Sequence, residues 1–332
     1  MKVSIIVPVY NVSTYIENCL SSIMNQTYKD IECLIVDDAS TDDSITKCEK
    51  MIAEYEGDIH FIIIHHTKNQ GISAARNTGL DASHGDYVYF IDSDDEISPN
   101  CIEALSSACI KDNTIEIVQG SYIKNTFDDN LNKKNVQNIK KREYEYYEFT
   151  RNREIRDHFF DGKGYLNIAA WNKLIKKEFL INHNLRFEEG LLWEDNMWSF
   201  FVMKYLKHLY LVPDITYSYN IRPKSIQTGT SKRAKRQIWG RIYKTIVDTP
   251  TPGDEVLEQL YYMPKFCYYY VTEYKDENYK YSYKAFEKTL SKSRANVSLR
   301  YLFLLKFARF MALTPPTRYL YVLIYYLYTK LI

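Results

Sequence analysis

The chain has 332 residues, a formal net charge of +1 and 26% charged residues. This length allows two domains, or one domain with a sizeable appendage. A hydrophobic content of 45% is typical of a folded protein and excludes extensive disorder. Because no global basic field exists, nucleic acid is not expected to be the main partner.

Six cysteines are spread along the chain, and none forms a C-x-x-C pair. The sequence therefore supports neither a zinc site nor a thioredoxin-like motif. Most of these cysteines fall on apolar faces, where a free thiol behaves as a small hydrophobic group, and this favours a reducing compartment. The N-terminus runs directly into an apolar stretch without a signal-peptide h-region, so a cytoplasmic protein is expected.

Short apolar runs alternate with helical patterns over the first 120 residues. Thr14 and Glu17 offer a capping box for the first helix, and Asp42 or Ser44 is expected to begin the second. The apolar runs show little alternation, as expected when both sheet faces are covered. They predict an α/β fold with a mostly parallel sheet flanked by helices. The expected strands are residues 3–9, 31–36, 59–64, 87–91 and 115–118.

Polar clusters follow three of these expected strands, at Tyr10-Asn11, at Asp37-Asp38 and at residues 92–95. In open α/β sheets, ligands bind beyond the carboxyl ends of the strands. The edge that these clusters share is therefore the expected position of a ligand site. No G-x-G-x-x-G follows a strand and no G-x-x-x-x-G-K-[ST] occurs, so dinucleotide oxidoreductases and P-loop kinases are not favoured.

Asp92, Asp94 and Asp95 place three carboxylates within four residues. Such groups repel one another unless a positive charge lies among them. Mg²⁺ prefers oxygen ligands and takes one or two carboxylates together with substrate phosphates. The alternative is a solvated turn that ends a strand, and the position at a strand end favours the metal site.

Three other charged residues have two interpretations each. Asp38 can accept hydrogen bonds from a base or ribose, or can form a turn that caps the next helix. Arg76 can clamp a phosphate, or can be a surface arginine. Asp195 can act as a general base beside an aromatic wall, or can be the N-cap of the helix that follows it.

The sequence resembles the family 2 glycosyltransferases, which are inverting enzymes with a GT-A fold. The resemblance is dense over about the first 110 residues, thinner to about residue 226 and absent afterwards. It rests on the collinear order of several segments. These are residues 3–11 (VSIIVPVYN), 26–27 (QT), 32–42 (ending DDASTD), 69–77 (NQGISAARN), 86–95 (DYVYFIDSDD), 171–174 (WNKL) and 193–195 (WED).

The resemblance implies a role for each matching position. It implies a base pocket lined by Pro8 and Tyr10, a base-reading carboxylate at Asp38, commonly for uracil, and ribose or phosphate contacts at Asp92 and Ser93. It also implies that Asp94 holds a Mn²⁺ or Mg²⁺ ion and that Asp195 is the catalytic base. Residues 217–225 resemble a segment in which an arginine approaches the diphosphate. The family usually has glycine where this chain has Ala39.

Four residues are expected to contact the acceptor, because flat aromatic faces suit sugar rings. The alternative left open for the two tryptophans and the lysine is packing in the domain core. The four residues are Trp171, Lys173, Trp193 and Glu194.

The expected function is metal-dependent, inverting transfer of a sugar from a nucleoside-diphosphate sugar, such as a UDP-sugar, to a glycan or lipid-linked acceptor in polysaccharide biosynthesis. Two alternatives remain. A nucleotidyltransferase would need a Gly-rich basic loop after the first strand, and residues 9–13 (VYNVS) have neither glycine nor arginine. A non-catalytic nucleotide-sugar or membrane-binding scaffold would not need Asp94 and Asp195.

The expected organisation is a nucleotide-sugar-binding half over residues 1–120, an acceptor-binding half over 121–226 and a helical region over 227–332. Residues 124–148 are polar and suggest a loop or mobile insertion. Residues 301–313 and 319–332 are apolar with embedded basic residues, and neither is long enough to span a bilayer. Two interpretations remain for them: helices at the inner face of the cell membrane, or core and oligomer-contact helices.

Overall fold

The computed structural model describes residues 1–127, 133–138, 147–160, 166–222, 231–273, 275–292 and 296–313. It contains two compact units, the first of residues 1–159 and 164–228, the second of 160–163 and 229–332. Strand β6 (Ile117–Phe127) crosses the expected division at residue 120, so the two expected halves of the first unit share one sheet.

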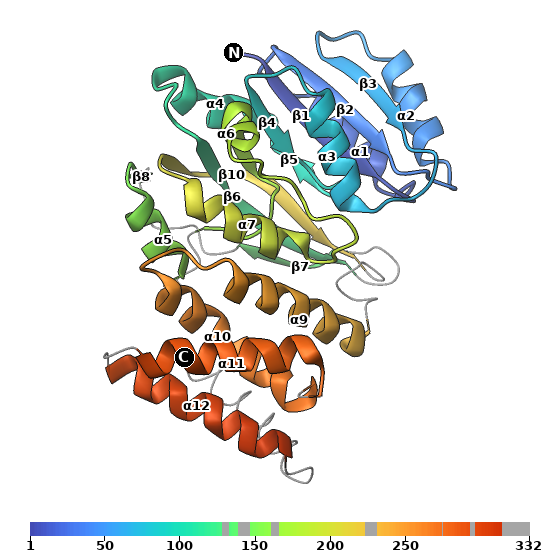
Figure 1. Cartoon of the computed structure of the whole chain (residues 1–332). Helices are drawn as coiled ribbons and strands as arrows, with labels where there is room; N and C mark the ends of the chain where they lie inside the picture. The colour runs from blue at the N-terminus through green and yellow to red at the C-terminus, as the bar shows by residue number, and fades with distance from the viewer. Residues whose placement is uncertain are drawn as a thin grey trace. The chain divides into compact units, whose positions relative to one another are not determined.

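One ten-stranded sheet forms the first unit (Figure 1). Its main path runs β3-β2-β1-β4-β9-β6-β10-β5, with β7 beside β6 and β8 beside β10. Strands β1 to β4 are parallel, β9 is antiparallel to β4 and β6, and β10 is parallel to β6. The other bounds are β1 Val3–Val9, β2 Ile31–Asp37, β3 His60–His65, β4 Tyr87–Phe90, β5 Glu96–Ile97, β7 Lys133–Asn138, β8 Tyr147–Phe149, β9 Lys173–Lys176 and β10 Leu209–Ile221.

Helices cover both faces of the parallel strands, which explains their continuous apolar character. Ile5 and Val7 belong to a core shared with α1 and α4, whereas the intervening Ile6 meets α3. A Cβ atom on Gly79 would lie 2.4 Å from Ile6 Cγ2, so glycine allows this close approach. The helices of this unit are α1 Ile16–Met24, α2 Ser44–Ala53, α3 Ile72–Ala82, α4 Cys101–Lys111, α5 Asn152–Phe160, α6 Lys177–Asn182 and α7 Glu194–Tyr205.

Several expectations of local structure need correction. The N-cap of α1 is Tyr15, and no side-chain hydrogen bond caps the helix there. The Thr14–Glu17 capping box is therefore not formed. Glu17 instead pairs with Lys47 at 3.0 Å. The polar region 124–148 contributes strand β7 and part of β8, and its residues 128–132 and 139–146 lie outside the described residues. All six cysteines are free and buried.

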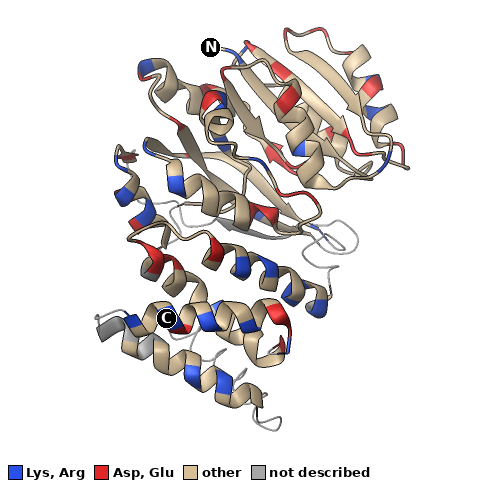
Figure 2. Ribbon diagram, viewed as in Figure 1, with Lys and Arg blue, Asp and Glu red and all other residues tan. Residues whose placement is uncertain are grey.

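In the second unit, the described residues form the helices α9 Lys232–Asp248, α10 Glu255–Glu273, α11 Glu277–Lys292 and α12 Asn296–Leu313. Aromatic rings fill its core, where Tyr243 and Phe286 meet Phe266 edge to face at 5.2 and 4.6 Å between ring centroids. Buried tyrosines such as Tyr243, Tyr279 and Tyr283 belong to this core. Lysines and arginines recur along α9 (Figure 2).

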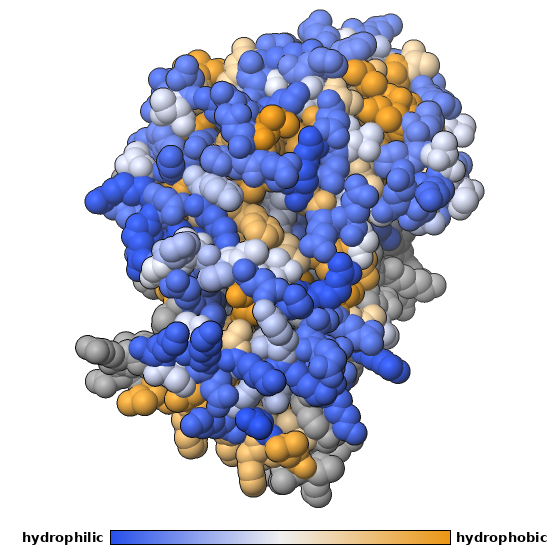
Figure 3. Space-filling model, in the orientation of Figure 1, coloured by the Kyte–Doolittle hydropathy of each residue, from blue (hydrophilic) through white to orange (hydrophobic). Residues whose placement is uncertain are grey.

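Exposed hydrophobic side chains gather on α12 (Figure 3). Phe303 is 72% exposed, and Leu299, Phe310 and Leu313 are each at least 60% exposed. Across the described residues, the structure has no helix whose length and apolar character suit a membrane crossing. The membrane-surface contact expected for 301–313 therefore stays a prediction, and the second apolar segment, 319–332, lies outside the described residues.

Glu32 is buried at the edge of the sheet opposite the carboxyl ends of the parallel strands. Its carboxylate accepts hydrogen bonds from Ser4 Oγ at 2.6 Å and the His84 backbone N at 2.5 Å, and it pairs with Lys2 at 2.9 Å. Burial alone raises the pKa of Glu32, but these hydrogen bonds outweigh it and lower the pKa from 4.5 to about 2.

A folded-state pKa below the unfolded value stabilises the protein above the unfolded pKa, and the stabilisation disappears as pH falls toward 2. We expect Glu32→Gln to lower the free energy of unfolding by about 3 kcal/mol at pH 7 and by much less at pH 3. Urea unfolding of both proteins at the two pH values measures this. An equal difference at pH 7 and pH 3 would contradict the assignment.

Candidate active site

The candidate site lies at the edge of the sheet where the carboxyl ends of β1, β2, β4 and β10 meet. Strand β9 is antiparallel to β4, so its amino end lies at the same edge. Four non-glycine residues with positive φ occur in segments that enter this edge: Asn11 (50°), Ala39 (60°), Asn172 (59°) and Trp193 (56°). Backbone strain of this kind clusters at functional sites. The conformation of Ala39 also explains why glycine suits this position.

Asp38 follows β2 and is 3% exposed. Its carboxylate accepts hydrogen bonds from the backbone N of Gln70 at 2.8 Å and of Gly71 at 2.7 Å. His66 Nδ1 lies 2.7 Å from the same carboxylate, and His66 Nε2 lies 2.9 Å from Thr78 Oγ1. Asp38 therefore fixes the loop before α3, and its base-reading role stays a prediction.

The three acidic residues after β4 have different partners. Asp95 is 1% exposed and accepts hydrogen bonds from Tyr217 Oη at 2.6 Å and the Asn220 backbone N at 2.7 Å. Burial, with Asp94 and Asp92 adding to it, raises the pKa of Asp95 well above its usual value. Asp95 thus attaches the loop to β10, and both of its carboxylate oxygens accept a hydrogen bond from within the protein.

Asp94 has a different kind of partner, the guanidinium of Arg222 at the end of β10. Arg222 Nε lies 2.5 Å from Asp94 Oδ2, and the Arg222 side chain is 23% exposed. Burial raises the pKa of Asp94, Arg222 opposes this shift, and Asp92 adds to it. Asp94 lies among other carboxylates and already pairs with a cation. These are properties that suit a ligand of a hard divalent metal ion.

Arg76, on α3, brings residues from distant parts of the chain together. Its Nη2 atom lies 2.7 Å from Asp92 Oδ1, and its Nη1 atom lies 2.6 Å from Glu194 Oε1 and 3.0 Å from Asp195 Oδ1. Asp92 is two residues from Asp94, so the expected metal loop and the expected base belong to one site. Arg76 is 1% exposed, which excludes the surface-arginine alternative.

Asp195 is the second residue of α7, and the N-cap is Trp193. The N-cap interpretation of Asp195 is therefore wrong. Besides Arg76, the Asp195 carboxylate accepts a hydrogen bond from the Ala170 backbone N at 3.3 Å. Burial raises the pKa of Asp195, Arg76 opposes the shift, Asp92 adds to it and Lys173 lowers it, with a net increase. Burial and Asp195 also raise the pKa of Glu194. Arg76 opposes this increase, and the resulting pKa is about 7.

Three of the four residues expected to contact the acceptor are buried, namely Trp171, Lys173 and Glu194, and Glu194 pairs with Arg76. Trp171 is 6% exposed, and its ring stacks on Tyr217 and Tyr219 at centroid distances of 4.5 and 5.3 Å. Lys173 is 2% exposed and donates to the carbonyl oxygens of Asn167, at 2.8 Å, and Ala169. Their burial fits core packing, the alternative left open from sequence for Trp171 and Lys173, and the acceptor contacts stay predictions.

The remaining expected residues differ in exposure. Tyr10 is 45% exposed beside β1, whereas Pro8 is buried within the strand and Ser93 is 6% exposed. Trp193 is partly exposed directly before Glu194. These positions keep Tyr10 and Trp193 available to ligands, and the roles assigned to all four residues stay predictions.

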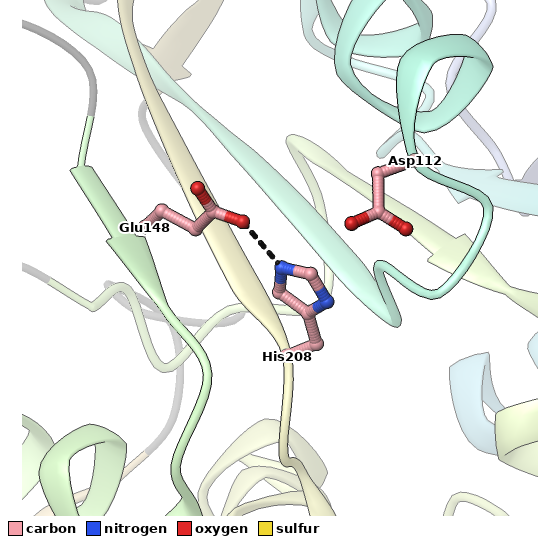
Figure 4. A group of neighbouring side chains, drawn as sticks. All are labelled: Asp112, Glu148 and His208. Atoms are coloured by element: carbon pink, nitrogen blue, oxygen red, sulfur yellow. Dashed lines mark hydrogen bonds and ion pairs between the residues drawn. The ribbon is translucent and has the colours of Figure 1, made fainter.

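A second group of potential metal ligands, Asp112, Glu148 and His208, lies elsewhere (Figure 4). His208 precedes β10 and Asp112 precedes β6, so the group lies at the amino ends of these parallel strands. Both ring nitrogens of His208 have partners, Glu148 Oε1 at 2.8 Å and Thr114 Oγ1 at 3.0 Å. This group is therefore at the opposite edge of the sheet from Asp94 and Asp195.

Sequence reasoning did not identify His66, Tyr217 or Asn220 as supports of the site. Their partners are 28, 122 and 125 residues away in sequence, at Asp38 and Asp95. The available signal was the third acidic residue of the cluster, Asp95, because a buried carboxylate without a metal needs hydrogen-bond donors.

Residues 4–179 match the profile of Glycosyl transferase family 2. The chain belongs to this family of glycosyltransferases. It is 34% identical over 229 residues to Glycosyltransferase GlyA of Streptococcus pneumoniae serotype 4, with 68% of this chain and 31% of GlyA covered. It is 32% identical over 235 residues to the putative glycosyltransferase EpsH of Bacillus subtilis, with 70% of this chain and 64% of EpsH covered. The chain thus spans about a third of GlyA and under two thirds of EpsH.

Two solved structures have the same fold. TarS residues 1–349 of S. aureus, in complex with UDP-GlcNAc, give a TM-score of 0.65 at 18% identity, covering 94% of this chain and 88% of that one. The mannosyltransferase PcManGT of Pyrobaculum calidifontis, in complex with GDP-Man and Mn²⁺, gives 0.57 at 16% identity, covering 98% and 84%. These similarities confirm the expected α/β, GT-A-type fold.

Proposed function

We propose that this chain is a metal-dependent, inverting glycosyltransferase. In this proposal it moves a hexosyl or N-acetylhexosaminyl group from a nucleoside-diphosphate sugar, a UDP-sugar, to a hydroxyl group of a glycan or lipid-linked acceptor. The observation that carries the proposal is the shared contact of Arg76 with Asp92 and Asp195, which joins the acidic loop to the candidate base. The nucleotide-sugars bound to TarS and PcManGT support the donor class.

Asp94 would hold a Mn²⁺ or Mg²⁺ ion, which when bound supplies positive charge for the departing diphosphate. Arg222, whose guanidinium pairs with Asp94, would lie near the donor phosphates. The exposed ring of Tyr10 and the loop that Asp38 fixes would receive the nucleotide. The Mn²⁺ bound to PcManGT supports this arrangement.

Asp195 would take the proton from the acceptor hydroxyl as that oxygen forms a bond to the anomeric carbon. The bond from this carbon to the diphosphate oxygen breaks in the same displacement, and the bonding electrons leave with the nucleoside diphosphate. Attack opposite the leaving group inverts the anomeric centre. The raised pKa of Asp195 makes it a stronger base than an exposed aspartate, provided that the pH is above that pKa.

Cell-surface polysaccharide synthesis, with the chain at the inner face of the membrane, is the setting that we propose. The exposed hydrophobic residues of α12 support contact with lipid-linked acceptors. The scaffold alternative is less favoured, because the chain has at Asp94 and Asp195 the carboxylates that the proposed reaction needs and a scaffold would not.

A donor screen tests the proposed function. The full chain is incubated with a panel of UDP-, GDP- and TDP-sugars, with and without Mn²⁺ or Mg²⁺, and release of nucleoside diphosphate is measured. We expect release from at least one donor, most readily a UDP-sugar, and loss of that release when EDTA is present. Donor binding without release from any member of the panel, with acceptor glycans supplied, would favour the scaffold instead.

A further inference from the structure

Arg76 is surrounded by carboxylates rather than directed to an open pocket. Both of its Nη atoms contact acidic side chains, those of Asp92, Glu194 and Asp195, at 2.6 to 3.0 Å. Two of these partners are adjacent in α7, and the third lies in the loop after β4. One guanidinium therefore fixes the distance between two segments that are about a hundred residues apart in sequence.

The surroundings of Arg76 limit what else it can bind. Its guanidinium carbon lies 5.1 Å from the centroid of the Phe187 ring, which in turn stacks on Trp198 at 4.9 Å. Arg76 Nε is buried and has no hydrogen-bond partner among the described residues. Three of the five guanidinium N–H donors are thus directed to carboxylates, and the Nε donor is buried, which leaves little of Arg76 for a phosphate.

The charges of this cluster also favour its present arrangement. Burial alone lowers the pKa of Arg76, but Asp195, Asp92 and Glu194 raise it above its ordinary value. The guanidinium is therefore a permanent cation, and its planar fork holds carboxylates in fixed directions. Lys173 is the second cation that acts on Asp195.

We propose that Arg76 is a positioning residue for the base Asp195 and not a ligand of the donor diphosphate. Its contacts hold the Asp195 carboxylate deprotonated and oriented, and they hold the acidic loop in register with it through Asp92. This inference rests on the proposed function, because it assigns a role to Arg76 in that same reaction. It also changes the phosphate-clamp role that the sequence suggested.

The two roles predict opposite kinetic results. A diphosphate ligand contributes to donor binding, so its loss raises the donor KM and the Kd of UDP. A residue that orients the base contributes to the chemical step, so its loss lowers kcat with little change in UDP binding. Misplacement of a reacting group by about 1 Å costs roughly 100-fold in rate.

The experiment compares Arg76→Gln and Arg76→Lys with the wild-type chain, with Arg186→Lys as the matched control. Arg186 pairs with Asp81 on α3 and donates to the carbonyl oxygen of Asn77 at 3.4 Å. We expect kcat to fall about 100-fold in Arg76→Gln and less in Arg76→Lys, while the Kd of UDP in Mn²⁺ buffer changes less than about threefold. The acidic limb of the profile of kcat against pH should move to higher pH in Arg76→Gln, because Asp195 loses a neighbouring cation that lowers its pKa.

Two results would overturn this inference. One is a tenfold or greater increase in the Kd of UDP in both variants. The other is a wild-type kcat, per folded molecule, together with an unchanged pH profile in Arg76→Lys. Circular dichroism reports how much of Arg76→Lys is folded, and this variant replaces Arg76→Gln if the latter is insoluble. Failure of the proposed function would give a different result from failure of this inference, because the wild-type chain itself would transfer no sugar. The UDP titrations would still show whether Arg76 contributes to UDP binding.

Discussion

Replacing Asp195 with asparagine is expected to lower kcat by about 10²- to 10⁴-fold and to leave the Kd of UDP within about twofold of wild type. The asparagine side chain keeps an oxygen that can accept from Arg76 and from the Ala170 backbone N, at the 3.0 and 3.3 Å contacts that Asp195 now makes. The negative charge is lost, and with it the ability to accept a proton from the acceptor. Initial rates and calorimetric UDP titrations measure the two effects separately.

The matched control for this variant is Asp81→Asn, which alters a 62% exposed carboxylate that also pairs with an arginine. Its kcat should equal that of the wild-type chain. The pH dependence gives a further check, because a base must be deprotonated to act. Since the pKa of Asp195 is raised, wild-type kcat should rise with pH through a value above the ordinary aspartate pKa. Normal turnover by Asp195→Asn would mean that another group removes the proton.

Replacing Asp94 with asparagine is expected to remove most of the activation by divalent cations. The loss of this carboxylate should lower kcat by about 10²- to 10³-fold, because metal stabilisation of the leaving group contributes several kcal/mol. Calorimetry should show Mn²⁺ binding in the presence of UDP weakened at least tenfold, which is about 1.4 kcal/mol. This binding measurement does not depend on turnover.

Asp112→Asn is the matched control, since Asp112 belongs to the other group of potential ligands, at the opposite edge of the sheet. It should leave Mn²⁺ binding with UDP and kcat unchanged. If Asp112→Asn abolished metal activation while Asp94→Asn retained it, the metal would have to be assigned to the Asp112, Glu148 and His208 group.

The first half of the fold was predictable because its signals are local. The apolar run of β1 coincides with the observed strand, Val3–Val9, and β2 extends one residue past its predicted end. The position of the site was predictable for a related reason, since parallel strands bring their carboxyl ends to one edge. Strand β6 is longer than predicted, because its polar second half pairs with β7 and β10, which no local pattern reveals.

The partners of individual side chains were not predictable from sequence. A tryptophan suits a sugar ring and a protein core equally well, and only the positions of Tyr217 and Tyr219 assign Trp171 to the core. The same holds for Arg76, whose partner Glu194 is 118 residues away. Residue type predicted an aromatic contact at Trp171 and a charged contact at Arg76, and the fold determined which groups make them.

In the proposed reaction, this site transfers a sugar from a nucleoside-diphosphate donor in a single displacement. Proton NMR of the full chain with Mg²⁺, the donor found by the screen and an acceptor glycan tests it most directly. We expect the anomeric signal of the donor to disappear while a glycoside signal of opposite anomeric configuration grows. A product with the donor's anomeric configuration, or an unchanged donor signal in a mixture where UDP binds, would contradict it.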